Sequence, residues 1–484
     1  MDGTAAVGIS DLLRRAAIAQ PAATAVIDSA AAVTWAELDD AVNRAANGYL
    51  ARLAEPGDRV TLQLPTGLDF VTAYLGALRA GLIAVPINPA STGVEVDFIR
   101  NDCAATLHVD GDTVGTLGEA AAEAGDPHRD RGGEELSVLL YTSGTSGHPR
   151  AAMLSARALL ANLDQLNSVD PPMITGADIL FLPLPLSHVF GLNAGLGMAL
   201  RVGATLVLAD RFDATATLAT MAEQRVTAVL GVPGQYAQWL RNPDMARGFA
   251  SVRFAMSGST TLPRALLEGY RERGIVIYDG YGLTEASPVV SVNALGDRDH
   301  PKAGSIGRPL PGIDVQLRDE DGDEVEVEDP GRLFIRGANL FSGYWPDGAD
   351  GPDPEGWFGT GDIAVADADD DLHLVGRSTE LVIVNGFNVY PAEVEAVLGR
   401  EPGVGEVAVT GIPDEVTGEA VVAYVVPTPG ARLDADLLLA AAARSLARFK
   451  LPARISVVDA LPHTVTGKIM KWQLARDGAP VGGD

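Results

Sequence analysis

The chain has 484 residues, 47% of them hydrophobic and 21% charged, a composition typical of a globular protein with room for two or three domains. Its 36 basic and 64 acidic residues give a formal net charge of −28, which argues against nucleic acid and anionic membranes as partners. Cys103 is the only cysteine, which excludes an internal disulfide and a cysteine-based metal site. The N-terminal residues lack a secretory signal pattern, and no uninterrupted apolar run could cross a bilayer, so we expect a cytoplasmic protein without an integral membrane segment.

Short apolar strands alternate with amphipathic helices from residue 35 onward. The first predicted helix, Trp35–Leu53, places its apolar residues on one face. The elements predicted after it are a strand at Arg59–Leu64, a helix at Leu68–Arg79, a strand at Leu82–Pro86 and a helix at Val94–Asp102. This alternation predicts a parallel sheet with helices on its faces.

The next predicted strand, Leu136–Tyr141, runs into a loop of hydroxyl-bearing residues and glycines. This loop consists of Thr142, Ser143, Gly144, Thr145, Ser146 and Gly147, and Arg150 follows it. Glycines let such a loop fold tightly with N–H groups pointing inward, which suits a polyphosphate. It is not a Walker loop, because no Gly-Lys-Ser/Thr follows the glycines. The alternative is a flexible surface linker, but a linker rarely separates a buried strand from an apparent helix, here Ser155–Gln165.

The strand and helix pattern continues to about residue 280. Strands are predicted at Ile179–Leu182, Ala204–Leu208, Ala228–Gly231, Val252–Met256 and Ile275–Asp279, and helices at Thr215–Gln224, Gln235–Arg241 and Pro263–Arg273. Ligands of open parallel sheets bind beyond the carboxyl ends of the strands. The glycine-rich segments after Tyr141 and Asp279 are therefore candidate ligand-binding loops.

The pattern changes from about Ile313. Strands Ile313–Arg318, Arg332–Arg336 and Leu372–Val375 are separated by acidic turns, and we interpret Asp319–Asp323 as a solvated hairpin tip rather than a calcium loop. Past Arg377 a small α+β unit is predicted, with strands at Glu380–Val384, Val407–Ile412, Val421–Val426 and Arg454–Val458 and helices at Pro391–Leu398 and Asp434–Arg448.

Two segments that follow predicted strands carry candidate ligand groups. Tyr281 offers a ring face for a base, Gly282 permits close approach, Thr284 adds a hydroxyl and Glu285 a hard oxygen for magnesium. Gly258-Ser259-Thr260 follows another strand, where a helix cap is at least as good an explanation. Taken alone, an ordinary turn with a packed tyrosine explains the first segment better.

Four single residues are further candidates. Asp362, in Thr360-Gly361-Asp362, could pair with two ribose hydroxyls, although this tripeptide also occurs in many turns. Arg377 could bind a sugar or phosphate oxygen or form a surface ion pair. Lys468, in a polar loop near the C-terminus, could reach an anionic transition state, although such lysines are usually solvated. His188 lies in an apolar segment, which is more typical of a core histidine than of a metal ligand.

Each signal is weak alone, but their order and spacing are specific. Together, Tyr141–Arg150, Tyr281–Glu285, Thr360–Asp362, Gly376–Arg377 and Gly467–Lys468 resemble the superfamily of adenylate-forming enzymes, which contains acyl-CoA synthetases, peptide-synthetase adenylation domains and luciferases. The resemblance covers about Thr34 to Lys471. Val384–Pro391, followed by Glu393 and Glu395, is most similar to bacterial fatty acid–CoA ligases.

The resemblance implies an α/β fold with two domains. A large N-terminal domain, residues 1–377, would combine parallel-sheet α/β layers with a small barrel-like β region, and a small mobile α+β C-terminal domain, residues 378–484, would carry the catalytic lysine. The carboxylate of an acid would attack the α-phosphate of ATP, giving an acyl adenylate and pyrophosphate. A thiol, usually that of coenzyme A, would then attack the adenylate.

The implied substrates and cofactors are ATP, Mg²⁺, coenzyme A and a carboxylic acid, with a medium or long chain fatty acid expected first. Three alternatives remain open at this point. The acceptor could be the phosphopantetheine thiol of a carrier protein, the acid could be an aryl or short-chain acid, or the chain could be a degenerate nucleotide-binding protein. The retention of Lys468, Glu285 and Asp362 argues against the last of these.

The resemblance also implies roles by position. Nucleotide contacts fall to Thr142–Gly147 (β- and γ-phosphates), Thr284 (α-phosphate), Glu285 (magnesium), Gly258 to Thr260 with Tyr281 (adenine), and Asp362 with Arg377 (ribose). Lys468 would bridge carboxylate and phosphate, Gly386 would line the thiol route, His188 would lie near the acyl carboxylate, and Val232, Pro233 and the region of Phe190 would wall the acyl pocket.

The chain departs from the superfamily pattern at two positions. Arg150 stands where lysine is usual, which keeps the charge but alters the contact geometry. Thr379 stands at the hinge, where aspartate or lysine is usual. A hinge needs only a residue that can absorb a backbone change, so rotation is expected to persist with altered kinetics.

Overall fold

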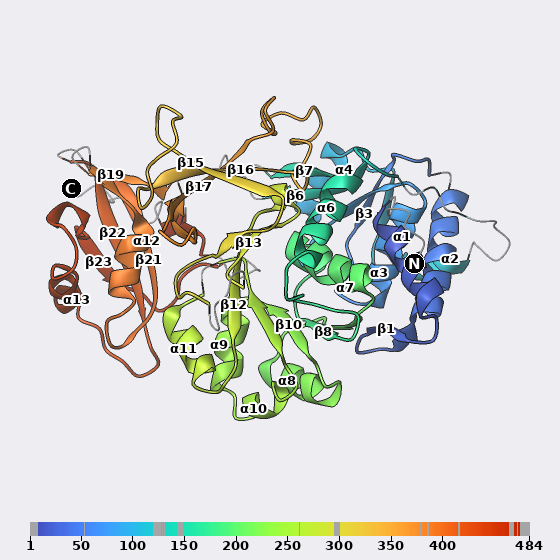
Figure 1. Cartoon of the computed structure of the whole chain (residues 1–484), viewed down its shortest axis with the longest axis horizontal. Coiled ribbons are helices and arrows are strands. Elements are labelled where there is room, and N and C mark those ends of the chain that lie inside the picture. Colours follow the sequence, from blue (N-terminus) through green and yellow to red (C-terminus); the bar gives the residue numbers. More distant parts are fainter. Residues whose placement is uncertain are drawn as a thin grey trace. The chain divides into compact units, whose positions relative to one another are not determined.

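The computed structural model describes residues 8–52, 54–119, 127, 129, 131–142, 149–260, 262–294, 301–377, 380–384, 387–414, 417–463, 469–471 and 473–474. The chain separates into two compact units (Figure 1). The first consists of Met1–Val315 with Ile335–Phe358, and the second of Gln316–Phe334 with Gly359–Asp484. Within the described ranges, no helix combines the length and apolar character required to span a bilayer.

The first unit contains a five-stranded sheet in the order β5-β3-β4-β6-β7. Its strands are β3 (Arg59–Leu62), β4 (Ile83–Pro86), β5 (Leu107–Val109), β6 (Leu136–Thr142) and β7 (Arg150–Ser155). β5, β3, β4 and β6 are parallel, and β7 is antiparallel to β6. The helices of this part are α2 (Trp35–Ala51), α3 (Leu68–Arg79), α4 (Gly93–Asp102) and α5 (Gly115–Glu119).

Local capping sets where two of these helices begin. Thr34 Oγ1 accepts a hydrogen bond from Glu37 N at 3.2 Å, and the Glu37 carboxylate accepts one from Thr34 N at 2.8 Å. Thr92 and Glu95 form the same reciprocal pair at the start of α4. These capping boxes satisfy N–H groups that have no partner inside the helix. The sequence predictions for α2, α3 and α4 are confirmed to within two residues at each end.

A second sheet in this unit has nine strands in the order β14-β13-β12-β11-β10-β8-β9-β1-β2. The strands are β1 (Thr24–Ile27), β2 (Ala32–Thr34), β8 (Ile179–Leu182), β9 (Thr205–Leu208), β10 (Ala228–Gly231), β11 (Phe254–Ser257), β12 (Ile277–Gly282), β13 (Val289–Val292) and β14 (Arg308–Pro309). The central strands from β12 to β1 are parallel, and β2, β13 and β14 add antiparallel edges.

Helices cover both faces of the nine-stranded sheet. They are α1 (Ile9–Ala19), α6 (Ala156–Asn167), the π-helix η1 (Phe190–Gly197), α7 (Met198–Val202), α8 (Ala214–Glu223), α9 (Pro233–Arg241), α10 (Met245–Gly248) and α11 (Arg264–Arg271). Figure 1 shows α9 and α11 to one side of β10 and β12 and α7 to the other. On the α9 and α11 side, Trp239 is the centre of a buried aromatic cluster. Its ring meets those of Phe212, Tyr236 and Phe249 edge to face, and its Nε1 donates to Thr217 Oγ1 at 2.8 Å.

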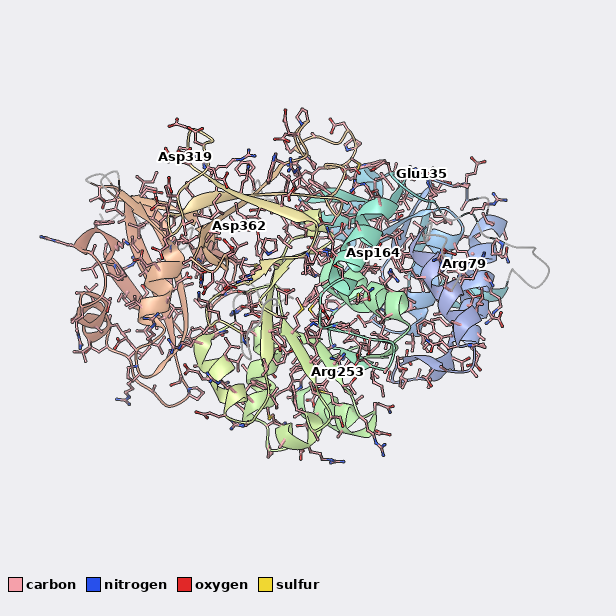
Figure 2. All side chains as sticks on the ribbon, in the orientation of Figure 1. Arg79, Glu135, Asp164, Arg253, Asp319 and Asp362 are labelled. Carbon is pink, nitrogen blue, oxygen red and sulfur yellow. The ribbon has the colours of Figure 1, made fainter. Side chains whose placement is uncertain are left out.

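A four-stranded sheet follows, in the order β15-β16-β17-β18. Its strands are β15 (Ile313–Arg318), β16 (Gly331–Gly337), β17 (Phe358–Ala366) and β18 (Leu372–Arg377). The Asp319 turn is exposed, and its carboxylate accepts hydrogen bonds from Asp321 N and Asp323 N, each at 2.9 Å (Figure 2). The prediction of a solvated hairpin tip at Asp319–Asp323 is confirmed.

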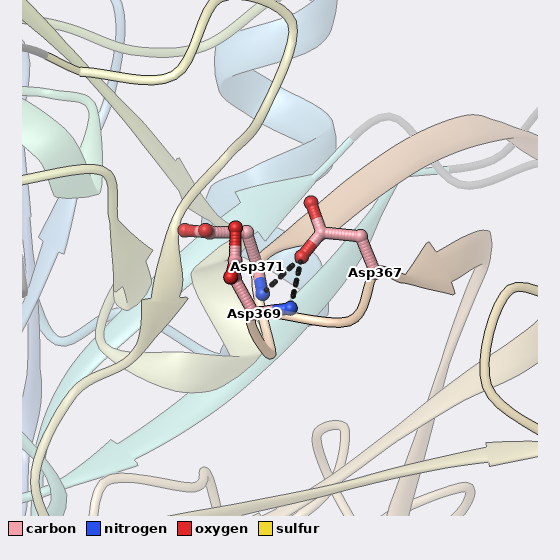
Figure 3. A group of neighbouring side chains, drawn as sticks. All are labelled: Asp367, Asp369 and Asp371. Carbon is pink, nitrogen blue, oxygen red and sulfur yellow. Dashed lines mark hydrogen bonds between the residues drawn. The ribbon is translucent and has the colours of Figure 1, made fainter.

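The β17–β18 turn has the same construction. Asp367 Oδ1 accepts from the backbone N–H groups of Asp369 and Asp371 at 2.9 and 3.1 Å (Figure 3). His373 Nε2 lies 2.7 Å from the other oxygen of Asp367. The three carboxylates lie close together because the turn requires an acceptor at its first position and the hairpin brings the other two alongside.

The second unit also contains a five-stranded sheet, in the order β20-β19-β22-β21 with β23 paired to β22. Its elements are β19 (Val382–Val384), β20 (Phe387–Val389), α12 (Pro391–Leu398), β21 (Val404–Asp414), β22 (Gly418–Pro427), α13 (Ala435–Ala442), the 3-10 turn η4 (Arg448–Lys450) and β23 (Arg454–Val457). Valines and leucines of β19 to β22, α12 and α13 form its core. The predicted mixed α+β pattern is confirmed, although α13 ends six residues earlier than expected, at Ala442.

Two local predictions are wrong, and one strand was not predicted. The chain enters an antiparallel strand, β7, before the helix α6, and does not pass directly into a helix. This strand was not predicted, because residues 151–155 are all buried and lack the alternation of apolar and polar residues that marks a strand. Gly280–Gly282 continues β12 and pairs with β13, so it is not a loop. Asp362 lies within β17, a strand whose two glycines and polar residues hide its period.

Candidate active site

The carboxyl ends of β11 and β12 bring two candidate segments together. In the parallel register Ser257 pairs with Asp279, so Gly258 and Gly280 follow at the same level. Beyond Gly258, Ser259 has a φ of 71°, in the left-handed region where residues other than glycine are uncommon. Ser259 and Thr260 are exposed, whereas the ring of Tyr281 is buried. Gly258 to Thr260 therefore lie beyond the end of β11, as predicted, whereas Tyr281 lies within β12.

Asp279, in β12, forms hydrogen bonds that connect the ends of β11 and β12. Its Oδ2 accepts a hydrogen bond from Leu262 N at 3.1 Å, which fixes the far end of the segment that contains Gly258 to Thr260. Its own N–H donates to Asn293 Oδ1 at 2.6 Å. Burial raises the pKa of Asp279 to about 7, against a partial offset from the hydrogen bonds that its carboxylate accepts from Leu262 N and Gly280 N.

Thr284 and Glu285 lie in the short 3-10 turn η2 (Thr284–Ala286) directly after β12. Both are half-buried. The Glu285 carboxylate accepts a hydrogen bond from the Tyr344 hydroxyl at 2.5 Å, and Glu285 O accepts from Phe341 N at 2.9 Å. Burial first, and the negative charge of Glu285 second, raise the pKa of Tyr344, so its hydroxyl remains a donor. The turn thus presents a hydroxyl beside an oriented carboxylate.

Arg150 approaches the same tyrosine from β7. Its guanidinium carbon lies 3.9 Å from the centre of the Tyr344 ring, and its Nη2 is 2.7 Å from Asp350 Oδ2. In the β6–β7 register Arg150 pairs with Thr142, whose Oγ1 donates to Arg150 O at 3.3 Å. Residues 143–148, which include Ser143, Gly144, Thr145, Ser146 and Gly147, lie outside the described residues. Both ends of the predicted phosphate loop are therefore held by one strand pair.

His188 lies two residues before η1. Its Nδ1 accepts a hydrogen bond from Phe190 N at 3.2 Å, and burial lowers the pKa of the imidazole. The ring is therefore neutral at physiological pH, with its proton on Nε2. This agrees with the expectation of a histidine in apolar surroundings, and it leaves Nε2–H as a donor.

The second unit carries the ribose candidates. Asp362, labelled in Figure 2, is buried, and its N–H donates to Thr360 Oγ1 at 3.1 Å. The β17–β18 register pairs it with Arg377. Thr360 Oγ1 in turn donates to Leu333 O at 3.0 Å. The two residues predicted to bind the ribose are thus neighbours on adjacent strands, which their distance in the sequence did not indicate. Lys468, Gly386 and Thr379 lie outside the described residues.

Several residues that build the site are not evident from the sequence. Tyr344 is the most direct, and its only signal is the preceding Gly343, which is common to many turns. Buried amides hold the surrounding backbone. Asn193 in η1 donates to Ser287 O at 2.7 Å, and Asn339 donates to Ala286 O at 2.8 Å. Asn162 in α6 exchanges two hydrogen bonds with the backbone of Val289.

The chemistry of this donor set fits a magnesium nucleotide. Carboxylate oxygen is the ligand type that Mg²⁺ prefers. Within the described part of the chain, the Tyr344 hydroxyl binds only one of the two Glu285 carboxylate oxygens, and the other could bind Mg²⁺. The Thr284 hydroxyl and the Arg150 charge suit phosphate oxygens. Mg²⁺ would arrive with the nucleotide as part of the substrate.

Comparisons with known proteins agree with this chemistry. A family model described as AMP-binding enzyme matches residues 13–345, and one described as AMP-binding enzyme C-terminal domain matches residues 393–468. A feruloyl-CoA synthase of an Amycolatopsis species is 35% identical over 96% of this chain and 97% of its own length. A long-chain-fatty-acid–CoA ligase of Yersinia pestis is 31% identical over 98% of this chain and 94% of its own length.

Solved structures give the same result. ATP-bound MatB from Rhodopseudomonas palustris superposes with a TM-score of 0.89 at 31% identity, covering 97% of this chain and 98% of that chain. The predicted resemblance to adenylate-forming enzymes and the predicted α/β fold, with a large N-terminal and a small C-terminal domain, are confirmed. The chain belongs to the AMP-binding enzyme family, whose activity is the AMP-forming ligation of an acid to coenzyme A through an acyl adenylate.

Proposed function

We propose that this chain activates a medium or long chain fatty acid with MgATP and transfers the acyl group to coenzyme A. The observation that supports this most is the η2 turn, where Thr284 and the Tyr344-bound carboxylate of Glu285 follow the ends of parallel strands. An acyl group would lie between η1 and the sheet, where the surrounding side chains are apolar. In addition, the Yersinia pestis relative is named as a long-chain fatty acid ligase.

In the first half-reaction, a substrate carboxylate oxygen forms a bond to the α-phosphorus and the bond to pyrophosphate breaks. Negative charge is distributed over phosphate oxygens, so positioning and opposite charge lower the barrier. We assign the α-phosphate to Thr284, magnesium to Glu285, the β- and γ-phosphates to Thr142–Gly147 with Arg150, and the adenine to Gly258-Ser259-Thr260 with Tyr281 and Gly282. His188 Nε2–H would donate toward the acyl carboxylate.

In the second half-reaction, a thiolate attacks the acyl carbonyl and AMP leaves. One site can serve both reactions if the lysine that stabilises the first is withdrawn for the second. We propose that residues 378–484 form the mobile domain, with Lys468 present in the first reaction, Thr379 as the hinge and Gly386 on the thiol route. Asp362 and Arg377, paired across β17 and β18, would bind the ribose hydroxyls.

An aryl acid is the second candidate substrate. One observation favours it: the feruloyl-CoA synthase relative matches this chain at 35% identity over nearly the full length of both proteins. A flat conjugated acid would also suit a pocket bounded by the Phe190 ring. The two candidates differ only in the acyl pocket, so they share the proposed roles of the nucleotide-binding residues.

Pyrophosphate exchange tests the proposal. ATP–pyrophosphate exchange would be measured with saturated acids of increasing length and with ferulate, and thioester formation with coenzyme A and with a carrier protein as acceptors. Glu285→Gln should lower exchange by at least roughly 100-fold, because it removes the charge that faces magnesium. Glu268→Gln, on exposed α11, is the matched control and should leave exchange unchanged. An unmodified chain that exchanges with none of these acids would refute the proposed activity.

A further inference from the structure

The nine-stranded sheet has one face that the aromatic core does not cover. Side chains alternate along β11, and Ala255 belongs to the core on the α9 and α11 side. Phe254 and Met256 therefore lie on the opposite face, toward η1 and α7. This face leads from the strand ends, where Gly258 and Gly280 lie, into the interior of the first unit.

A small apolar void lies on this face. It measures about 20 Å³, and its lining includes Ala194, Met198, Leu230, Phe254, Met256 and Val289. Every lining residue that the structure describes is apolar. A water there would find no polar partner, so the void suits a hydrocarbon group.

Met256 separates this void from the strand ends. A Cβ atom added to Gly280 would lie 2.1 Å from Met256 Cε, which means that the thioether methyl rests directly on the glycine backbone. A Cβ on Gly258 would lie 3.0 Å from the Phe190 ring. The Phe190 ring thus covers Gly258, and the Met256 thioether covers Gly280. Methionine is unbranched and adaptable, so Met256 is the more easily displaced of the two.

We propose that Met256 limits the length of the acyl tail that the site accepts. This rests on the proposed function, in which the acid's carboxylate lies toward His188 and Thr284. The tail then follows η1 beside the Phe190 ring and stops at Met256, and the void beyond is reached only when the Met256 side chain is removed or displaced. Within the range of acids proposed above, this inference selects an apolar acid of medium length or a flat aryl acid over a long chain fatty acid.

The test is a chain-length profile of ATP–pyrophosphate exchange, from hexanoate to hexadecanoate with ferulate added. In the unmodified chain the specificity constant should fall beyond a medium length. Met256→Ala should move that limit to longer acids, with a gain of roughly fourfold for each methylene newly accommodated. Met256→Leu, which keeps the volume, should retain the original limit. If Met256→Ala does not fold, Met256→Val serves the same purpose.

Two controls make the result specific. Met221→Ala truncates a fully buried methionine on the opposite, aromatic side of the sheet and should leave the length limit in place. Adding Ala194→Leu to Met256→Ala refills the void and should abolish the gain. A profile that Met256→Ala leaves unchanged, in an enzyme that does exchange, overturns this inference alone. A chain that exchanges with no acid overturns the proposed function and this inference with it.

Discussion

Tyr344 connects two charges that the sequence separates by 135 residues. Its hydroxyl donates to Glu285 and its ring lies against the Arg150 guanidinium. Because burial and Glu285 keep the phenol protonated, the hydroxyl orients the carboxylate at any physiological pH. The lysine-to-arginine departure at position 150 fits this arrangement, since a planar guanidinium stacks on a ring better than an ammonium does.

Tyr344→Phe should therefore weaken adenylation without unfolding the first unit. It removes one hydrogen bond to a charged group, worth about 1.5 to 3 kcal/mol, so we expect a loss of roughly 10- to 100-fold in the rate of pyrophosphate exchange. The loss should be smaller at high Mg²⁺ concentration, because excess metal compensates for a less ordered ligand. Tyr49→Phe removes a buried hydroxyl between α2 and α3 and serves as the control. Equal exchange rates in Tyr344→Phe and the unmodified chain would contradict this role.

Asp279 gives the first unit a pH dependence of known sign. Burial raises its pKa from 3.8 to about 7. Between these values the folded chain binds more protons than the unfolded chain, so the free energy of unfolding falls as pH rises from about 4 to about 7, by up to about 1.4 kcal/mol per pH unit.

Asp279→Asn removes this titration and keeps an acceptor for Leu262 N. The melting temperature of the variant minus that of the unmodified chain should be larger at pH 8 than at pH 4.5. Thermal unfolding at both pH values measures the difference, with Asp244→Asn, at an exposed aspartate, as the control. A variant whose melting temperature shows the same pH slope as the unmodified chain would contradict the assignment.

At the scale of elements, helices and strands could be predicted where local signals act alone. The α3 helix was predicted with its true ends, because apolar periodicity and flanking residues agree there. Prediction fails where tertiary contacts decide. Nothing in residues 190–197 distinguishes a π-helix from an α-helix, and the structure shows η1 held by Asn193, which donates to Leu159 O and Ser287 O. π-Helical segments are frequent at functional sites, and this one begins two residues after His188.

Lys471, three residues after Lys468, forms ion pairs with two carboxylates of the second unit. Its ammonium lies 2.9 Å from Glu380 Oε2 and 2.8 Å from Glu395 Oε1, and Glu395, in α12, also accepts from Val409 N. Burial alone would lower the pKa of Lys471, but the two carboxylates raise it above its ordinary value. His463 and Ile469 pair in an isolated antiparallel bridge.

Lys471→Met should destabilise the second unit by about 3 kcal/mol, because it leaves two partly buried carboxylates without their cation. Lys471→Arg keeps the charge and should restore most of the stability. Urea unfolding, followed by a probe in the second unit, compares the three chains. If Lys471→Met proved as stable as Lys471→Arg, the ion cluster would be incidental to folding.

At the scale of the whole molecule, the sequence identified the candidate site by order and spacing but not by contacts. Thr284, Glu285 and Gly258 to Thr260 were found because they follow apolar strands, and the structure places these strand ends side by side. Tyr344 and the buried asparagines were missed, because their partners are more than 50 residues away and no local pattern records such pairs. Assignments to Lys468, Gly386 and Thr379 remain predictions.

The strongest consequence of a domain that moves between two reactions concerns Lys468. If it serves adenylation alone, Lys468→Ala should lower ATP–pyrophosphate exchange by roughly 100-fold or more, because it removes a charge that faces the developing phosphate charge. Thioester formation from supplied acyl adenylate and coenzyme A should remain within about threefold. Lys450→Ala, which removes the lysine paired with Glu393 in the same unit, is the control and should spare both reactions. Equal losses in both half-reactions would mean that the lysine stays at the site throughout, and a rotating domain would then explain nothing.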